Sequence, residues 1–400
     1  MRILIAATNR TVEGGAETYQ HALIRELLAA GHHAALLHER PATPGRSTVD
    51  GDAHGIPAWC AAHMGTKVVV EYVAKWSPDV VYLQGLPSPA LEARVLDRWP
   101  CVLFAHDYYG TCETGTKRHA FPSVSMCTRT FGPTCLALHY PRRCGGLNPV
   151  TMLRTYRLQA ARHALLARYR TICVASAHMR SEYLRHRLPQ DRLHVLPLPP
   201  AGIARDAAPP APRPPGNHVV MAGRLTNLKG GDLLVDALQP ASHLLGRPLS
   251  LTVMGDGPER GRLESRARLR GVTARFVGWA SVAERNRMLR TADVLAIPSV
   301  WPEPWGLVGL EAARAGVPAV AFATGGIPEW LVPGETGELA PAAPPTPAGL
   351  AAAIARALGD PEHYSHLCHG AWVRAGQYTM ERHMDELLGV LARAGGGSRE

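Results

Sequence analysis

Short runs of aliphatic and β-branched residues alternate with segments of helical periodicity along most of this chain. The first run, Arg2 to Ala7, is followed by the Gly14-Gly15 turn and then by helical spacing from Ala16 to Ala30. A strand, a glycine turn and a helix in that order are typical of a unit in which helices connect parallel strands. This rhythm predicts an α/β fold built on doubly wound parallel sheets.

A proline-rich stretch interrupts the rhythm near the middle of the chain. Residues 205–216 contain five prolines, which lack the amide hydrogen that a sheet requires and favour extended polyproline geometry. Because 400 residues exceed one ordinary core, we place a linker there, between an N-terminal domain at 1–204 and a C-terminal domain at 217–372. The helical tail at 373–400 is a candidate for return to the N-terminal domain. Strands are expected at Arg2–Ala7, His33–His38, Asp79–Gln84, Cys101–Ala105, His218–Ala222, Leu249–Met254, Ala274–Val277, Val294–Pro298 and Ala319–Ala323.

Composition excludes several classes of protein. Hydrophobic residues make up 46% and charged residues 19%, a balance typical of packed globular proteins and not of disordered ones. No uninterrupted apolar run approaches the length of a membrane-spanning helix. The start, MRILIAATN, indicates a buried strand and not a secretory signal. We therefore expect a cytoplasmic protein, and its net charge of +10 favours anionic partners.

Positive charge is concentrated in residues 142–187, which carry ten arginines and a single acid, Glu182. Apolar residues recur there at helical spacing, so we expect a basic helical face. Two interpretations of this face are open. It is either an ordinary solvated surface helix, or a face that makes peripheral contact with anionic lipid at the inner membrane surface or with an anionic acceptor. Nucleic acid is not expected as a partner, because the sequence contains no recognisable binding module and no interleaving of basic and aromatic residues.

A long insertion, residues 106–145, follows the strand run at 101–105 and is rich in cysteine. Loops of this length are usually functional, so the insertion either shapes an acceptor pocket or is a structural excursion. A structural metal site and reduced, packed thiols are both open, although the strongest zinc signature, a C-x-x-C pair, is missing from it. The candidate metal ligands are Cys112, Cys127, Cys135 and Cys144.

The segment GRLTNLKGG, from Gly223 to Gly231, follows a predicted strand and leads into a helix near Asp232. Glycines let the backbone approach an anion, and Arg224 and Lys229 add cations that can hold a diphosphate without a metal ion. A surface turn with solvated cations is the alternative for these residues taken alone. The order of residues differs from a Walker A loop.

A second turn, Met254-Gly255-Asp256-Gly257-Pro258, follows the next predicted strand. Open α/β sheets bind their ligands at the carboxyl ends of strands, so the position of this turn indicates a ligand site. Glycine and proline also favour an ordinary tight turn, which is the alternative.

The segment PSVWPEPWGLVGLEA places Glu303 and Glu311 eight residues apart across a strand-to-helix junction. The amides of Gly306, Leu307 and Val308 open this helix and can bind phosphate oxygens. Carboxylates accept hydrogen bonds from hydroxyls, so one glutamate can bind a sugar and the other a ribose on either side of a diphosphate. A solvated carboxylate on the helix surface is the alternative for Glu311 alone.

Together these motifs resemble the retaining glycosyltransferases of family 4, whose GT-B fold has two Rossmann-like doubly wound parallel-sheet domains facing across a cleft. G-R-L-x-x-x-K-G at Gly223, G-x-G-P at Gly255 and E-x7-E at Glu303 match the family's motifs in the family's order. GGIPE at 325–329 and GETG at 334–337 look like its C-terminal loops. The resemblance covers most of the chain.

The resemblance implies a role for each matching position. Arg224 and Lys229 would bind the donor diphosphate and stabilise it as it leaves. Glu303 would bind the transferred sugar and Glu311 the nucleotide ribose. The pair His106-Asp107 would reach the donor sugar from the N-terminal domain. The other implied donor-binding positions are Gly15, Gly223, Gly255, Val277, Gly306, Leu307 and Val308.

The implied activity is transfer of a sugar from a nucleoside diphosphate sugar, most often UDP-linked in this family, to a hydroxyl of a glycan, lipid-linked or small-molecule acceptor. Configuration at the sugar would be retained, no metal or other cofactor would be required, and the product would belong to glycan or polysaccharide biosynthesis. A nucleotide-sugar epimerase or hydrolase on the same fold and a nucleic-acid-binding protein are the alternatives. Asp50-Gly51-Asp52 spells the D-x-D of metal-dependent transferases of another fold, but short acidic turns are common, and we assign it no metal.

Overall fold

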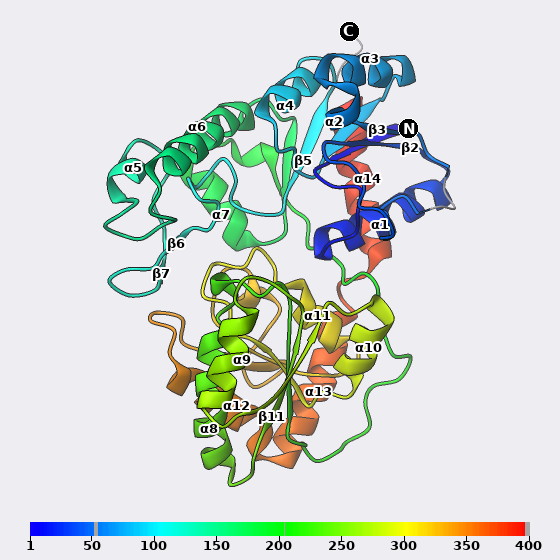
Figure 1. Ribbon diagram of the computed structural model, residues 1–400. Coiled ribbons are helices and arrows are strands. Elements are labelled where there is room, and N and C mark those ends of the chain that lie inside the picture. Colours follow the sequence, from blue (N-terminus) through cyan, green and yellow to red (C-terminus); the bar gives the residue numbers. More distant parts are fainter. Residues whose placement is uncertain (52–54, 204, 397–400) are drawn as a thin grey trace. The chain divides into compact units, whose positions relative to one another are not determined.

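The computed structural model describes residues 1–51, 55–203 and 205–396, which form two compact units (Figure 1). The first unit comprises residues 1–116 and 128–201 together with the chain from residue 380 onward. The second comprises residues 117–127 and 202–379. Each unit is built on one parallel sheet with helices, which confirms the predicted α/β class.

Within the described residues, the sheet of the first unit has seven parallel strands in the order β3-β2-β1-β4-β5-β8-β9. The chain starts at β1, adds strands on one side and then crosses to the other, so the sheet is doubly wound with its switch point between β1 and β4. The β1 residues Ile3, Leu4 and Ile5 are fully buried, as expected for a parallel sheet covered on both faces. The strands are β1 (Arg2–Ala7), β2 (His33–His38), β3 (Ala58–Cys60), β4 (Val80–Leu83), β5 (Cys101–Ala105), β8 (Thr171–Val174) and β9 (Leu193–Val195).

Local signals in the sequence place the helices of the first unit. Helix α6 begins at Pro149, and the side chain of Asn148 accepts hydrogen bonds from the amides of Val150 and Thr151. This combination of a capping side chain and a first-turn proline is favoured at helix starts. The helices are α1 (Gly15–Ala29), α2 (Ala61–Met64), α3 (Thr66–Trp76), α4 (Pro89–Leu96), α5 (Thr134–Leu138), α6 (Pro149–Leu166), α7 (Ala177–Arg185), the 3-10 helix η1 (Gln190–Arg192) and α14 (Met380–Gly395).

Residues 142–187, for which the sequence predicts a basic helical face, contain two helices with a strand between them. Strand β8 separates α6 from α7 and pairs in parallel with β5. Its sequence, Thr171-Ile-Cys-Val, is a short β-branched run that periodicity alone does not distinguish from a buried helical turn. Pairing with a distant strand therefore decides the local structure.

Within the described residues, the sheet of the second unit has six parallel strands in the order β12-β11-β10-β13-β14-β15, with its switch point between β10 and β13. Helices α8 and α12 pack together, and their buried Leu234, Leu238 and Ile354 belong to the core of this unit. The strands are β10 (His218–Ala222), β11 (Ser250–Met254), β12 (Thr273–Gly278), β13 (Val294–Ile297), β14 (Ala319–Phe322) and β15 (Gly337–Ala340). The helices are η2 (Asn227–Lys229), α8 (Gly231–Leu245), α9 (Arg260–Leu269), α10 (Val282–Arg290), α11 (Leu307–Ala313), η3 (Ile327–Glu329), α12 (Pro347–Gly359) and α13 (Pro361–Ala375).

Every strand expected from the sequence forms within one residue of the expected bounds. The strands that the sequence did not indicate include β3 and β9 at the two edges of the first sheet and β15 at an edge of the second. An edge strand is paired on one side only, so it needs no long apolar run to be stable. The antiparallel hairpin β6 (Arg118–His119) and β7 (Ser125–Met126) was also not indicated, and the insertion that carries it is divided between the units.

The proline-rich residues 205–216 contain no helix or strand. Arg213 holds this stretch against the second unit, because its Nη1 lies 2.7 Å from Asp293 Oδ1. None of the helices in the described parts of the chain is both long and apolar enough to cross a membrane.

Helix α14 belongs to the first unit although it ends the chain, and it packs against β4 and β5 (Figure 1). Its buried His383 donates from Nδ1 to the Pro197 carbonyl at 2.9 Å, so Nε2 accepts from the Tyr19 hydroxyl at 2.8 Å. The Tyr19 hydroxyl also lies 3.1 Å from the hydroxyl of Tyr82 on β4. Burial lowers the pKa of His383 to about 4, so the ring is neutral near pH 7.

We expect His383 to make the free energy of unfolding depend on pH. Its pKa is lower in the folded than in the unfolded protein, so its contribution is complete above the ordinary value of 6.5 and is lost as the pH falls toward 4. Over this pH range, the free energy of unfolding should change by on the order of 2 kcal/mol more in wild type than in His383→Gln. Urea unfolding followed by circular dichroism across this pH range measures the difference.

The matched control is His33→Gln, since His33 is exposed. If His383→Gln kept the full pH dependence of the wild type, the neutral buried state of His383 would be contradicted.

Candidate functional site

Two loops of the second unit leave neighbouring strands at the switch point of its sheet. The first follows β10 and contains Lys229, and the second follows β13 and contains Glu303. Lys229 Nζ donates to Glu303 Oε1 at 2.6 Å. Crevices outside the carboxyl ends of strands at a switch point are where open α/β sheets bind ligands. The fold therefore brings together two of the predicted site residues, Lys229 and Glu303.

Glu303 is held in one orientation by its neighbours. The residue is only 4% exposed, and its Oε1 also accepts hydrogen bonds from Ser299 Oγ at 2.5 Å and Trp301 Nε1 at 2.9 Å. Burial acts to raise the pKa of Glu303, but the charge of Lys229 and these hydrogen bonds outweigh it, so the pKa is lowered overall. The site therefore presents a fixed carboxylate beside an ammonium group.

Close backbone contacts explain the glycines of the predicted motifs. A Cβ atom on Gly255 would lie 2.0 Å from the Gly223 carbonyl oxygen, and the Gly255 amide donates to the Gly278 carbonyl at 2.7 Å. A Cβ atom on Gly230 would lie 2.0 Å from the Pro298 carbonyl oxygen. The turn after β11 therefore supports the loop after β10, which in turn touches the loop after β13.

The later GGIPE motif supports Glu303 from behind. The amide of Gly326 donates to the Glu303 carbonyl at 2.8 Å. Trp330 Nε1 donates to the Trp305 carbonyl at 2.6 Å, which fixes the backbone just before α11. Gly326 of this motif and the following Trp330 therefore both contact the segment that contains Glu303 and Trp305.

Glu311 lies in α11 and differs from Glu303 in its partners. It is also only 4% exposed, and Arg285 Nη2 of α10 lies 3.1 Å from its Oε1. Burial raises the pKa of Glu311 to about 7, and Arg285 and Arg314 oppose the shift only in part. The sequence did not indicate Arg285, because its only local signal is a place on a basic helix distant in sequence from Glu311.

The remaining predicted donor-binding residues are placed as follows. Arg224 is exposed in the loop that carries Lys229, and it forms no ion pair with the described residues. Val277 lies on β12, beside the β11 strand that ends before Gly255. Gly306 caps α11, so Leu307 and Val308 begin that helix with amides facing out of its first turn.

The first unit has a cavity of about 430 Å³ at the carboxyl edge of its sheet. Thr8, Gln84 and His106 line it from the ends of β1, β4 and β5. His106 Nε2 lies 2.5 Å from the accepting Gln84 Oε1, so this nitrogen carries the proton. Burial lowers the pKa of His106 to about 4, which makes the ring a neutral donor near pH 7. Gly15 begins α1 in the same unit and is not among the residues that line this cavity.

The wall of this cavity contains cationic, acidic and amide groups. Burial raises the pKa of Asp107 to about 6, while the Tyr109 amide donates to its Oδ1 at 2.8 Å. The Arg162 guanidinium lies 4.8 Å from the Tyr109 ring centroid, and Arg40 also faces the cavity. Gln159 is buried, and its Nε2 has no hydrogen-bond partner among the described residues. Such mixed donors and acceptors suit a ligand with several hydroxyl groups.

Sequence reasoning placed only His106 and Asp107 of this wall near a ligand. Gln84 directly follows β4 and Arg40 lies two residues after β2, so their position after strand ends was the signal that could have revealed them. Arg162 and Gln159 come from α6, and only the packing of that helix brings them to the cavity.

The four candidate metal ligands of the cysteine-rich insertion are all half-buried. In the part of the chain that the structure describes, no group of three or more histidine, cysteine or acidic residues could hold a metal ion. Cys127 belongs to the second unit, and Cys112, Cys135 and Cys144 belong to the first.

Asp50, the first aspartate of the D-x-D sequence, has a structural role in the fold. Arg10 donates from Nε to Asp50 Oδ1 at 2.9 Å and from Nη2 to Oδ2 at 2.6 Å. The buried Asp50 is therefore occupied by a bidentate ion pair with the half-buried Arg10. Asp52 lies outside the described residues.

Comparison with known families finds matches in both halves of the chain. Residues 14–199 match the family described as "Glycosyl transferase 4-like domain". Residues 205–371 match the family described as "Glycosyl transferases group 1". The first match ends at residue 199 and the second begins at residue 205, so together they span most of the chain.

Curated relatives align over parts or nearly all of the chain. D-inositol 3-phosphate glycosyltransferase of Jonesia denitrificans is 36% identical over 189 residues, which are 45% of this chain and 44% of that protein. Glycogen synthase of Mycobacterium tuberculosis is 29% identical over 374 residues, 90% of this chain and 87% of that protein. 2-deoxystreptamine glucosyltransferase of Streptomyces kanamyceticus is 34% identical over 155 residues, 38% of each chain. The chain thus matches less than half the length of the first relative and most of the second.

Solved structures resemble the whole chain at low sequence identity. Sucrose-phosphate synthase from Thermosynechococcus elongatus has a TM-score of 0.72 at 19% identity and covers 98% of this chain and 100% of its own. Anabaena HepE in complex with UDP and glucose has a TM-score of 0.67 at 17% identity with the same coverage. At these identities the likeness shows the fold alone.

We expect Glu311 also to make the free energy of unfolding depend on pH, but in the opposite direction to His383. Its pKa is raised in the folded protein, so its contribution is complete below the ordinary value of 4.5 and is lost as the pH rises through 7. Between about pH 5 and pH 8, wild type should therefore lose on the order of 2 kcal/mol of stability relative to Glu311→Gln. Denaturant unfolding at the two pH values measures this change.

Glu362→Gln serves as the control, because Glu362 is exposed on α13. An equal pH dependence in wild type and Glu311→Gln would contradict the raised pKa.

Proposed function

Because the chain belongs to the group 1 glycosyltransferases with the GT-B fold, we propose that it transfers a sugar from a UDP-sugar to a hydroxyl group of an acceptor. The observation that carries the proposal is the contact between Lys229 and Glu303 at the switch point of the second sheet. A cation beside a carboxylate suits a ligand in which a diphosphate adjoins sugar hydroxyls, since the cation offsets phosphate charge and the carboxylate accepts from hydroxyls.

The solved relatives support UDP as the nucleotide. Structures of Anabaena HepE in complex with UDP and with UDP-glucose align with 98% of this chain, at TM-scores of 0.67 and 0.68. In the proposed complex, Arg224 and Lys229 bind the diphosphate and Glu303 binds the transferred sugar. Glu311, with Arg285 beside it, binds the ribose hydroxyls, and the amides that begin α11 contact phosphate oxygens.

We further propose that the reaction retains the configuration of the sugar and requires no metal ion. The bond between the anomeric carbon and the β-phosphate oxygen breaks, and the acceptor oxygen forms its bond to that carbon on the same face. The acceptor proton passes to an oxygen of the departing phosphate. Lys229 and Arg224 are suited to stabilising the charge that develops on UDP, because fixed cations need no reorganisation during the reaction.

The cavity of the first unit is the proposed acceptor site. Its volume of about 430 Å³ lies within the usual range for small-molecule sites, and its wall mixes guanidinium, carboxyl and amide groups. The names of the relatives support a hydroxylated acceptor, since they include an inositol phosphate transferase and a 2-deoxystreptamine transferase. A cytoplasmic location is also proposed, supported by the free buried thiols of Cys60, Cys101, Cys173 and Cys368.

Variants of the Lys229–Glu303 pair test the donor site. Lys229→Met should abolish the rise in melting temperature that UDP causes, because the phosphate loses its partly buried cation. Glu303→Gln should keep that rise and lower kcat/KM for the UDP-sugar by about 100-fold or more, because it removes the carboxylate that holds the sugar. Thermal shift and a coupled UDP-release assay measure the two effects.

Lys67→Met is the control, since Lys67 is exposed on α3. Unchanged UDP binding and turnover in both site variants would exclude this site. Nuclear magnetic resonance of the product should show a retained anomeric configuration with or without EDTA. Release of free sugar or of an epimer that added acceptor does not diminish would instead indicate a hydrolase or an epimerase.

Arg40 provides a separate test of the acceptor cavity. It is exposed to the cavity, and no side-chain ion pair with described residues holds it. We expect Arg40→Gln to lower kcat/KM for the acceptor by about tenfold, because one charge-assisted hydrogen bond is lost. The thermal shift caused by UDP should not change. Initial rates at varied acceptor and fixed donor concentrations measure the effect. An equal loss in Arg98→Gln, at an exposed site on another loop, would remove Arg40 from the acceptor site.

A further inference from the structure

One exposed surface of the first unit combines large apolar side chains with arginines. Leu147 is 81% exposed and Val150 is 74% exposed, at the turn that leads into α6. The Tyr140 hydroxyl donates to the Leu147 carbonyl at 3.4 Å, so these residues form one local surface. We name it the α5–α6 surface and define it by Tyr140, Arg142, Arg143, Leu147, Val150, Arg154 and Arg157, all of which are exposed.

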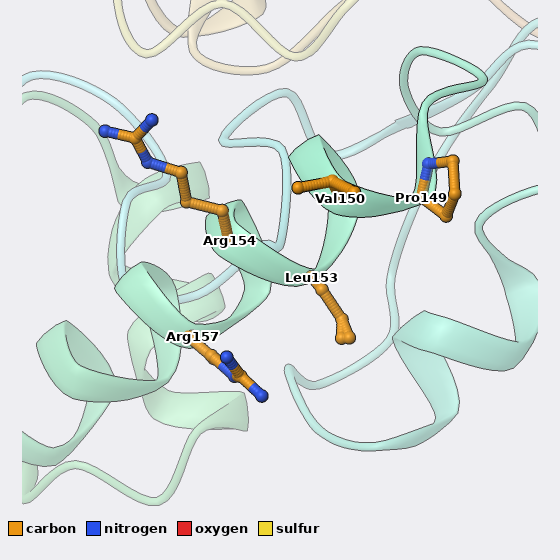
Figure 2. Close-up of a pocket in the computed structure, with 5 residues that line it drawn as sticks. All are labelled: Pro149, Val150, Leu153, Arg154 and Arg157. Atoms are coloured by element: carbon orange, nitrogen blue, oxygen red, sulfur yellow. The ribbon is translucent and has the colours of Figure 1, made fainter.

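The outward face of α6 continues this surface. Val150, Leu153, Arg154 and Arg157 line a hollow of about 500 Å³, and their spacing puts them on one face of the helix. Figure 2 shows Leu153 and Arg157 projecting from the same side of α6. An ordinary surface helix turns a mixed polar face to water, whereas this face is apolar and basic without a carboxylate.

Acidic residues do not balance this charge nearby in sequence. The chain has no aspartate or glutamate from residue 114 to residue 181, but eleven lysines and arginines. Arg142, Arg154 and Arg157 form no ion pair within the described residues of either unit. The α5–α6 surface therefore produces a positive potential that attracts an extended anion.

We propose that the α5–α6 surface docks on an anionic lipid bilayer, with Leu147 and Val150 inserted among the headgroups and the arginines bound to lipid phosphates. The aliphatic side chains gain by leaving water, and guanidinium groups bind phosphate oxygens well. Tyr140 suits the same depth, because tyrosine is enriched at membrane interfaces. Nucleic acid would use the arginines but would leave Leu147 and Val150 in water, so a bilayer fits better. This inference does not depend on the donor or acceptor proposed above.

Sedimentation of the full chain with lipid vesicles tests the proposal. We expect binding to phosphatidylcholine vesicles that contain about 30% phosphatidylglycerol, little binding to pure phosphatidylcholine, and weakening at high salt. Leu147→Ser/Val150→Ser should weaken the binding about tenfold or more by removing the inserted groups. Arg154→Gln/Arg157→Gln should weaken it about 25-fold, at about fivefold for each arginine near an anionic surface.

Matched variants on other surfaces separate this surface from general effects of charge and hydropathy. Leu244→Ser/Leu269→Ser changes leucines that are 65% and 87% exposed on the second unit, and Arg94→Gln/Arg98→Gln changes exposed arginines of the first. Both controls should bind vesicles like wild type, and unchanged melting temperatures should show that every variant is folded.

Three results would overturn the proposal. The first is no binding to the anionic vesicles at physiological salt. The second is normal vesicle binding by Leu147→Ser/Val150→Ser, which would mean that no side chain is inserted. The third is retention of RNA through the same arginines by a chain that does not bind vesicles, which would assign the surface to a nucleic acid.

Discussion

The carboxylate of Glu303, buried at the switch point of the second sheet, is the group around which the neighbouring loops are arranged. Removing a carboxylate from water is costly, and the cost is offset only when charged and hydrogen-bonding partners surround it. Lys229, Ser299 and Trp301 supply these partners, and the GGIPE loop fixes the Glu303 backbone. The Glu303 carboxylate thus needs partners from the loops after β10 and β13, and its contacts with them hold these two loops together.

The two glutamates of the E-x7-E pair show how partners decide the state of a buried acid. Both are equally buried, yet the pKa of Glu303 is lowered and that of Glu311 is raised to about 7. Glu303 accepts short hydrogen bonds from an ammonium, a hydroxyl and an indole, whereas the contact of Glu311 with Arg285 is longer and offsets its burial only in part. The same residue type therefore provides a fixed anion at one position and a titrating group at the other.

In both units polar residues gather at the switch point of the sheet, but they form a different arrangement in each. Each sheet has its switch point beside its first strand, and polar residues gather at the carboxyl ends there. In the second unit they form a charged pair, while in the first they surround a cavity with a neutral His106 and an Asp107 whose pKa is raised. Burial is the first cause of both shifts in the first unit. The α5–α6 surface lies on the first unit, and its residues are exposed.

The sequence by itself determined the strands with continuous apolar runs and the glycine turns, because each depends on neighbouring residues. The order of its motifs also indicated Lys229 and Glu303 before any contact was known. Only the tertiary structure decided that β8 interrupts the basic segment, that the cysteines are divided between units and that Arg285 meets Glu311. These features depend on which distant segments pack together and where side chains then point, and no local pattern carries that information.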